Sequence, residues 1–95
     1  MKTKTLYYFT DPGHGWVRVR RNEKLFQTIA DEVTSYSYQR GNYVYLEEDH
    51  DLGLYIKAIK AAGMEIKVEQ YSTNRLSKIR NYAPYEKHLG TLSEN

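Results

Sequence analysis

The residues best suited to chemistry lie in two short polar segments, and each segment holds one histidine. Asp11-Pro-Gly-His-Gly15 contains His14, which can act as an acid, a base or a metal ligand near neutral pH. Glu47-Glu-Asp-His-Asp51 places four carboxylates around His50, and carboxylates with a histidine can bind a divalent cation. If the two segments met in space, Asp11 and His14 could join the acids in a metal-dependent hydrolase.

A structural role explains both segments more simply. The proline and glycines of residues 11–15 are typical of a tight turn, in which Asp11 accepts backbone hydrogen bonds and His14 faces solvent. The acids of residues 47–51 complement a positive helix start, where Asp49 or Asp51 can cap. Neither segment has the spacing of a phosphate loop or an EF-hand. From the sequence we assign no catalytic residue, metal or cofactor, and keep Asp11 and His14 as a candidate ligand loop.

Tyrosine is the most unusual feature of the composition, with ten residues among 95. Residues 35–46 predict a β-hairpin that carries four of them, Tyr36, Tyr38, Tyr43 and Tyr45. A two-residue turn at Arg40-Gly41 pairs Tyr38 with Tyr43, and a turn at Gly41-Asn42 pairs Tyr38 with Tyr45. Either turn keeps the four rings on one face of the sheet, whereas a three-residue loop would separate them.

A second predicted strand adds to this face. Residues 16–20 alternate, with Val17 and Val19 on one side. If helices cover the valine side, the opposite side presents Trp16, Arg18, Arg20, Tyr36, Tyr38, Tyr43 and Tyr45. Tyr, Trp and Arg are the residue types most enriched in protein interface hot spots. The same rings could stack the bases of a single-stranded nucleic acid.

Two other uses of this face stay open. The C-terminal segment could pack on it through Ile79, Tyr82, Tyr85 and Leu89, or two copies of the chain could meet there as a homodimer. In the same segment Arg75, Lys78 and Arg80 are candidate phosphate contacts, although a solvated face of a short helix over residues 75–82 is the commoner explanation for such charges.

The remaining pattern predicts the elements that position these residues. Residues 5–10 and 64–70 read as strands. One helix follows Asn22, a good N-cap, and another follows residues 47–51 and ends at Gly63. The inward positions are Leu25, Phe26, Ile29, Ala30, Val33, Leu52, Tyr55, Ile56, Ile59, Ala62, Met64, Ile66 and Val68. The order β-β-α-β-β-α-β predicts an α+β fold, a mostly antiparallel five-stranded sheet with two helices on one face.

The length predicts a single domain over residues 1–95, with a core fold at 5–71 and a basic C-terminal segment at 72–95 whose end is frayed. There is no cysteine, which excludes disulfides and Cys-ligated metals. No apolar run approaches the about 20 residues of a membrane span, so no membrane partner is expected.

Charge is polarised along the chain although the net charge is only +2. Residues 1–45 carry seven Lys/Arg and four Asp/Glu, residues 46–70 three and six, and residues 71–95 four and two. A dedicated duplex-DNA binder usually has a stronger basic bias. The pattern fits a protein partner with complementary patches, or ordinary solvated surface.

Three strings together resemble a known family. They are Thr10-Asp-Pro-Gly-His-Gly-Trp-Val17, the segment from Tyr36-Ser-Tyr38 to Val44-Tyr-Leu-Glu-Glu-Asp49, and the basic Asn74-Arg75 to Ile79-Arg80. The chain resembles small uncharacterised proteins of bacteriophages and related mobile elements, over most of residues 5–80. The resemblance implies a phage or prophage origin and a cytoplasmic location in the host cell. Small phage proteins of this size often bind and inhibit host proteins, so it also implies a host protein as partner.

These observations lead to three hypotheses. The first is a non-enzymatic binding protein, a monomer or homodimer, that docks a host protein, such as a defence-system component, through the Tyr/Trp/Arg surface. The second is a single-stranded nucleic-acid or nucleotide binder that uses the same face. The third is the His14-based metal-dependent hydrolase.

Overall fold

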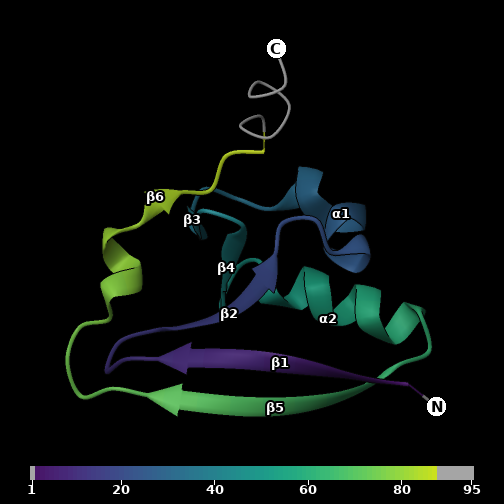
Figure 1. The fold of residues 1–95 in the computed structure, drawn as a ribbon, viewed down its shortest axis with the longest axis horizontal. Coiled ribbons are helices and arrows are strands. Elements are labelled where there is room, and N and C mark those ends of the chain that lie inside the picture. The colour runs from purple at the N-terminus through teal and green to yellow at the C-terminus, as the bar shows by residue number, and fades with distance from the viewer. Residues whose placement is uncertain (1, 88–95) are drawn as a thin grey trace.

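A computed structural model describes residues 2–87 and shows an α+β fold (Figure 1). The strands are β1 (Thr3–Thr10), β2 (Gly15–Arg20), β3 (Tyr38–Arg40), β4 (Tyr43–Glu47), β5 (Glu65–Ser72) and β6 (Ala83–Pro84). The helices are α1 (Lys24–Ile29) and α2 (Leu52–Ala61), with 3-10 turns η1 (Ala30–Glu32) and η2 (Lys78–Asn81).

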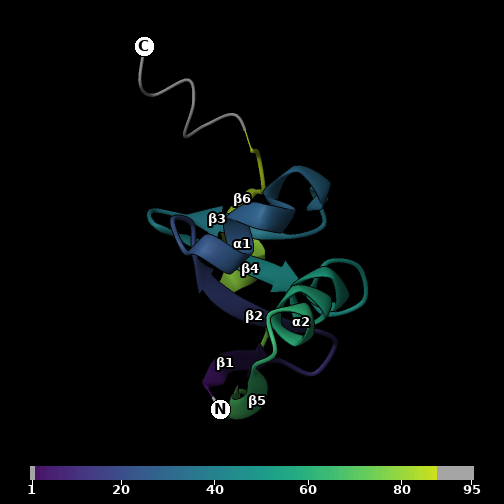
Figure 2. The same cartoon turned by 90° about the vertical axis from the view of Figure 1, so that its right-hand side faces the viewer.

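The sheet is mostly antiparallel, as predicted, but it has six strands in the order β5-β1-β2-β4-β3-β6. The sixth strand, β6, comes from the C-terminal segment and pairs with β3. Figure 2 shows β5 and β6 at opposite ends of the molecule. The C-terminal segment therefore extends the sheet at one edge.

The edge strand β5 runs parallel to β1 over its whole length, from Thr3 beside Glu65 to Thr10 beside Ser72. The chain leaves β4, passes through α2 and returns as β5 in the same direction. Parallel strands require such a crossover, usually through a helix. The β4-α2-β5 segment is one, so the sheet is mixed.

Both helices pack on one face of the sheet, as predicted (Figure 1). The main core consists of Leu6, Val17, Val19, Phe26, Ile29, Val33, Val44, Leu46, Tyr55, Ile59 and Tyr85. The predicted inward positions in α1, α2 and β2 thus meet in or around one cluster. Ala62, which was expected to continue the inward stripe of the second helix, is exposed just after α2 ends. Val68, which was also expected to face inward, is 55% exposed because β5 lies at the sheet edge.

The residues that cap the helices differ from those predicted. Glu23, and not Asn22, caps α1: its Oε1 accepts a hydrogen bond from Phe26 N at 2.8 Å. Asp51 stands at the start of α2 but makes no side-chain cap there. Its buried carboxylate binds Thr34 and Ser37 instead, and so holds the loop before β3 against α2.

Candidate binding face

The predicted aromatic and arginine face exists on the side of the sheet away from the helices. Arg18 lies beside Tyr45 across the β2–β4 pair, Arg20 lies beside Tyr43, and Tyr38 lies beside Tyr45 on β3. Side chains of directly paired residues point to the same side of a sheet. The hairpin turn is Gly41-Asn42, with Gly41 at φ +57°, which selects the second of the two predicted registers.

Tyr36 is not on a strand of this face. It precedes β3 in a turn, is 63% exposed, and stacks on His50 with ring centroids 4.1 Å apart. Three of the four hairpin tyrosines therefore stand on the strands of this face, and Tyr36 lies at its border, where it lines one cavity with Trp16 and Tyr38. The alternation that would have placed Tyr36 on the sheet ends because the loop before β3 is bound to Asp51.

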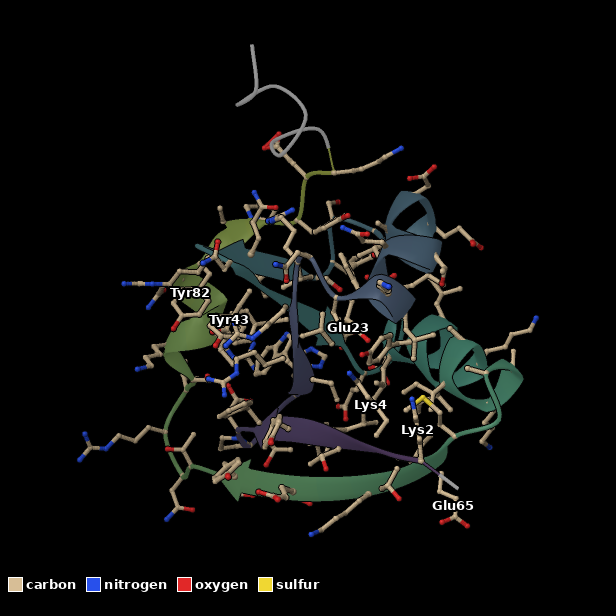
Figure 3. All side chains as sticks on the ribbon, turned by 45° about the vertical axis from the view of Figure 1, so that its right-hand side comes forward. Lys2, Lys4, Glu23, Tyr43, Glu65 and Tyr82 are labelled. Carbon is tan, nitrogen blue, oxygen red and sulfur yellow. The ribbon has the colours of Figure 1, made fainter. Side chains whose placement is uncertain are left out.

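The C-terminal segment covers one half of the face. Trp16 and Tyr45, 1% and 8% exposed, form a second buried cluster with Ile79. Tyr38 and Tyr82 pack around this cluster, and Figure 3 shows Tyr82 beside Tyr43 on the side of the sheet away from the helices. We call Trp16, Tyr38 and Tyr45, beneath Ile79 and Tyr82, the covered half; its role in this conformation is packing.

Two other residues of that segment were expected to pack on this face. Tyr85 instead reaches the helix side: its hydroxyl donates to Ala30 O at 3.0 Å and its ring meets Phe26 edge to face. Between Tyr82 and Tyr85 the chain runs as β6 along β3. Side chains three positions apart in extended backbone point to opposite sides of the sheet, so the two tyrosines pack on opposite faces. Leu89 lies outside the described residues.

An ion pair fastens the C-terminal segment to the first turn. Arg80 Nε donates to Asp11 Oδ2 at 2.6 Å, and Arg80 Nη2 donates to Asp11 Oδ1 at 2.8 Å. Asp11 also accepts from the backbone N–H groups of Gly13, His14 and Ser77. The Arg80 guanidinium, aided by these N–H groups, holds the pKa of Asp11 far below its usual range.

The three predicted phosphate contacts, Arg75, Lys78 and Arg80, therefore have different environments. Arg80 is engaged by Asp11 and lies over the Trp16 ring, 5.4 Å from its centroid. Arg75 and Lys78 are exposed and remain available to solvent. Asp11 accepts its backbone hydrogen bonds as predicted, but both of its oxygens are occupied, so it does not join a ligand site with His14.

The more exposed part of the face, which we call the open half, contains Tyr7, Phe9, Arg18, Arg20, Tyr43 and Tyr71. Glu69 lies beside Tyr7 and accepts a hydrogen bond from the Tyr71 hydroxyl, and Phe9 and Tyr43 also pack against the covered cluster. Arg18 is its centre, with the guanidinium carbon 4.8 Å from the Tyr43 ring centroid and 5.2 Å from that of Phe9. Phe9 in turn stacks on Tyr71 at 5.2 Å. Cation–π contacts of this kind orient an arginine without consuming its hydrogen-bond donors.

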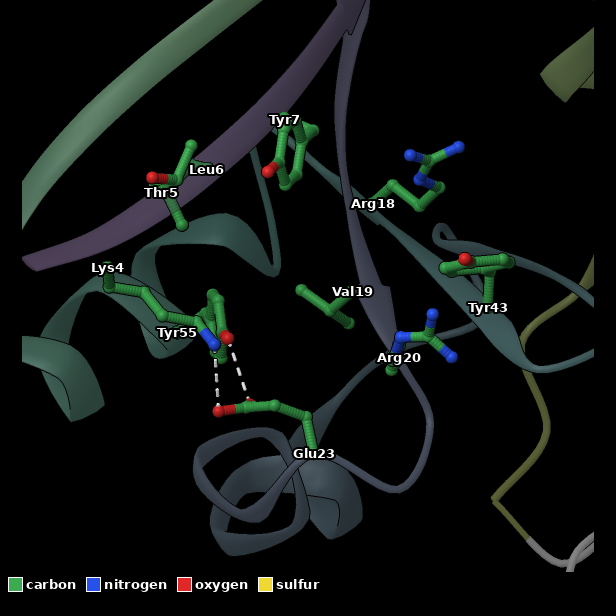
Figure 4. A pocket seen from close by; sticks show the side chains of 10 residues that line it. All are labelled: Lys4, Thr5, Leu6, Tyr7, Arg18, Val19, Arg20, Glu23, Tyr43 and Tyr55. Atoms are coloured by element: carbon green, nitrogen blue, oxygen red, sulfur yellow. Dashed lines mark hydrogen bonds and ion pairs between the residues drawn. The ribbon is translucent and has the colours of Figure 1, made fainter.

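A groove opens beside the open half because β1 and β2 separate. Their last paired residues are Tyr7 and Arg18, and beyond them a cavity of about 440 Å³ lies between the strands (Figure 4). Tyr7, Arg18, Arg20 and Tyr43 line it on the aromatic side. An exposed aromatic surface thus continues into a concave site, a combination that suits recognition of a protruding side chain.

The inner end of the groove is a fixed polar network. Glu23 accepts from Lys4 Nζ at 3.1 Å and from the Tyr55 hydroxyl at 2.9 Å (Figure 4). Burial opposes ionisation of Glu23, but the hydrogen bonds from Phe26 N, Lys4 and Tyr55 outweigh it and lower the pKa of this carboxyl. Burial and the neighbouring carboxylate raise the pKa of Tyr55. The charge of Lys4 is thereby matched by Glu23, which leaves Arg18 and Arg20 as the unmatched cations that line the groove.

Sequence reasoning missed three members of the open half, Tyr7, Phe9 and Tyr71. The alternation of residues 5–10 could have placed Tyr7 and Phe9 opposite Leu6, which would have put them on the arginine side. Tyr71 had no such signal, because its position depends on the parallel pairing of β5 with β1. The local sequence pattern does not show which strand lies beside β5.

The two histidine segments do meet in part. His14 Nδ1 lies 3.3 Å from Glu47 Oε2, with 43% of the His14 side chain and 7% of the Glu47 side chain exposed. Glu48, next along the chain, accepts a hydrogen bond from the Tyr8 hydroxyl. Burial, with the Glu48 carboxylate, raises the pKa of Tyr8 to about 12.

Comparison with known proteins gives no further guide: no family model, no curated protein and no solved structure matches this chain. Within residues 2–87, neither helix has the length and apolar character required to cross a bilayer.

Proposed function

We propose that the protein is a small non-enzymatic binding protein that docks a protein partner through the open half and its groove. The observation that carries this proposal is the ordered Arg18, held among the rings of Tyr7, Phe9 and Tyr43 beside a cavity. Residues held in place before binding lose little entropy on association. Aromatic and arginine side chains are also the commonest anchors of protein interfaces.

The charge of the groove indicates the kind of partner. Glu23 is already matched by Lys4, and Arg18 and Arg20 line the groove with no acidic neighbour other than Glu23 in its wall. The partner should therefore present an acidic surface with an apolar or aromatic side chain that enters the groove. Such complementarity sets orientation and speeds encounter.

The biological setting of the proposal rests on the resemblance to small phage and mobile-element proteins. From that resemblance we propose that the protein acts in the cytoplasm of a bacterial host, with a host protein, such as a component of a defence system, as the partner. This role requires no catalytic activity. Binding alone would block the partner.

Affinity capture from bacterial lysate tests the proposal. Tagged wild-type chain is compared with Tyr7→Ala/Arg20→Glu, which changes two surface residues of the open half, and with Tyr36→Ala/Lys57→Glu, a matched control on exposed positions elsewhere. We expect a partner that wild type and control retain and that the open-half variant loses. Equal recovery with all three chains would overturn the proposal.

A nuclease-treated arm and a salt series separate the nucleic-acid alternative. Recovery of nucleic acid alone, lost on nuclease treatment and weakening steeply with salt, would assign the open half to single-stranded nucleic acid. The nuclease and salt controls are needed because Arg18 lies among three aromatic rings, and nucleic-acid bases also stack on such surfaces.

A further inference from the structure

A small pocket lined in part by Trp16 and Tyr38 of the covered half holds the buried unsatisfied polar atoms of the described residues. Among residues 2–87, two buried side-chain polar atoms have no hydrogen-bond partner, Trp16 Nε1 and Glu47 Oε2. Both residues line one cavity of about 250 Å³, whose other lining residues are His14, Tyr36, Tyr38, His50 and Arg80. Buried polar atoms in proteins are almost always paired. Trp16 Nε1 is a donor, which a cation cannot satisfy, whereas Glu47 Oε2 is an acceptor and is therefore the atom that indicates a missing cation.

Glu47 is the more informative of the two. Its Oε1 accepts hydrogen bonds from Asp49 N at 2.9 Å and His50 N at 3.1 Å, which fixes the carboxylate. Its Oε2 is buried and points toward His14 Nδ1 at 3.3 Å without the alignment of a hydrogen bond. A buried carboxylate oxygen left without a partner is costly, and a cation between it and the imidazole would satisfy it.

The surrounding residues supply further ligands. One atom each of His14, Glu47, Glu48 and Asp49 lie within 4.8 Å of one another. Zinc bonds of about 2.0–2.2 Å in tetrahedral geometry put ligand atoms roughly 3.3–3.5 Å apart, which the His14–Glu47 distance already matches. Glu48 has one oxygen engaged by Tyr8 and the other available, and Asp49 is exposed and can adjust.

We propose that His14, Glu47 and Glu48, with Asp49 completing the set, form a binding site for a divalent cation of the zinc class. An imidazole among carboxylates suits Zn²⁺ or Mn²⁺, whereas Mg²⁺ and Ca²⁺ take oxygen ligands alone. Three adjacent carboxylates repel one another, and a divalent charge offsets that repulsion. The site would join the β1–β2 turn to the end of β4. It is separate from the open half, and the binding proposal does not depend on it.

Calorimetric titration of the untagged full chain with ZnCl₂, MnCl₂, MgCl₂ and CaCl₂ tests this site. We expect one equivalent of Zn²⁺, or of Mn²⁺ more weakly, to bind, and at least about tenfold weaker binding in His14→Gln and Glu47→Gln. His50→Gln and Asp31→Asn are the controls, because His50 lines the cavity outside the ligand set and Asp31 is a distant exposed acid; both should bind as wild type does.

A second readout guards against unfolding of Glu47→Gln. In wild type, Zn²⁺ should shift the NMR signals of the His14 imidazole and of the Tyr8 ring, and His14→Gln, which changes a partly exposed loop residue, should keep the wild-type circular dichroism. Absence of Zn²⁺ and Mn²⁺ binding heat would overturn the proposal. So would equal affinity in wild type and His14→Gln, or a loss in His50→Gln as large as that in His14→Gln.

Discussion

Arg80 closes a two-bond ion pair on Asp11 across 69 positions of sequence, with Arg80 Nε 2.6 Å from Asp11 Oδ2. The pair fastens η2 to the β1–β2 turn and so keeps Ile79 over Trp16 and Tyr45. It decides which part of the aromatic face is covered. The part that remains open is the surface to which we assign binding.

Replacing Asp11 by asparagine should release this fastening. The substituted side chain would lose the charge that Arg80 binds, and removing one member of an enclosed ion pair leaves the other poorly compensated. We expect a loss of several degrees in melting temperature. Asp31→Asn removes an exposed carboxylate paired with Lys87 and should change the melting temperature little; equal effects in both variants would contradict the assignment.

The same ion pair predicts how stability depends on acid. The folded-state pKa of Asp11 is lowered, so its stabilising effect is complete above the unfolded pKa of ~3.9. The effect is lost as the pH falls from that value toward the lower folded pKa. Urea unfolding from pH 7 to pH 2 should therefore show wild type and Asp11→Asn converging in acid. A constant difference over this range would contradict the prediction.

Tyr8 predicts a dependence in the alkaline range. Its folded pKa is about 12, raised by burial and by Glu48, against an unfolded value of ~10. Its contribution to stability is therefore present below pH 10 and is lost as the pH rises toward 12. A titration followed by absorbance at 295 nm should show one fewer tyrosine that ionises at high pH in Tyr8→Phe than in wild type. Between pH 9 and pH 11, the free energy of unfolding should fall less in Tyr8→Phe than in wild type.

Tyr55→Phe tests the network at the inner end of the groove. The hydroxyl is fully buried and donates to Glu23, so its removal should lower the free energy of unfolding by about 1.5 kcal/mol. Tyr36→Phe, at a tyrosine that is 63% exposed, is the control and should be neutral. Chemical denaturation measures both. A neutral Tyr55→Phe would mean that the Glu23 network contributes nothing.

Ile79→Ala tests the covered half. Ile79 is 4% exposed and packs against Trp16 and Tyr45, and truncating a buried isoleucine costs about 3 kcal/mol. Leu76→Ala changes a 74% exposed residue of the same segment and should cost almost nothing. Trp16 fluorescence should shift to longer wavelength in Ile79→Ala alone, because the indole would meet water.

Local pattern was sufficient wherever neighbouring positions decide the structure. The alternation in residues 16–20 placed Val17 and Arg18 on their correct faces, and Gly63 ends the second helix region at φ +74°. It was not sufficient where distant residues decide. The parallel pairing of β5, the Asp11–Arg80 pair and the binding of Asp51 to Thr34 join parts of the chain whose sequences show no sign of one another.

The residues of the candidate binding face also fall into those that local pattern predicts and those whose exposure depends on distant segments. The two arginines of β2 and Tyr43 were predicted for the face and lie on its open half. Trp16, Tyr38 and Tyr45 were predicted for the same face and occupy it, but the C-terminal segment covers them through Ile79 and Tyr82, which the sequence left as one of several alternatives. Burial by a distant segment depends on tertiary packing, which no periodicity reports.

The central claim is that the open half contacts the partner. The most direct measurement is an NMR titration of labelled chain with the captured partner, following the Nε–H signals of Arg18 and Arg20 and the ring signals of Tyr7, Tyr43 and Tyr71. We predict that these signals move together, while those of Lys57 on α2 and of Val68 stay in place. Movement of the Lys57 and Val68 signals, with those of the open half unchanged, would contradict it.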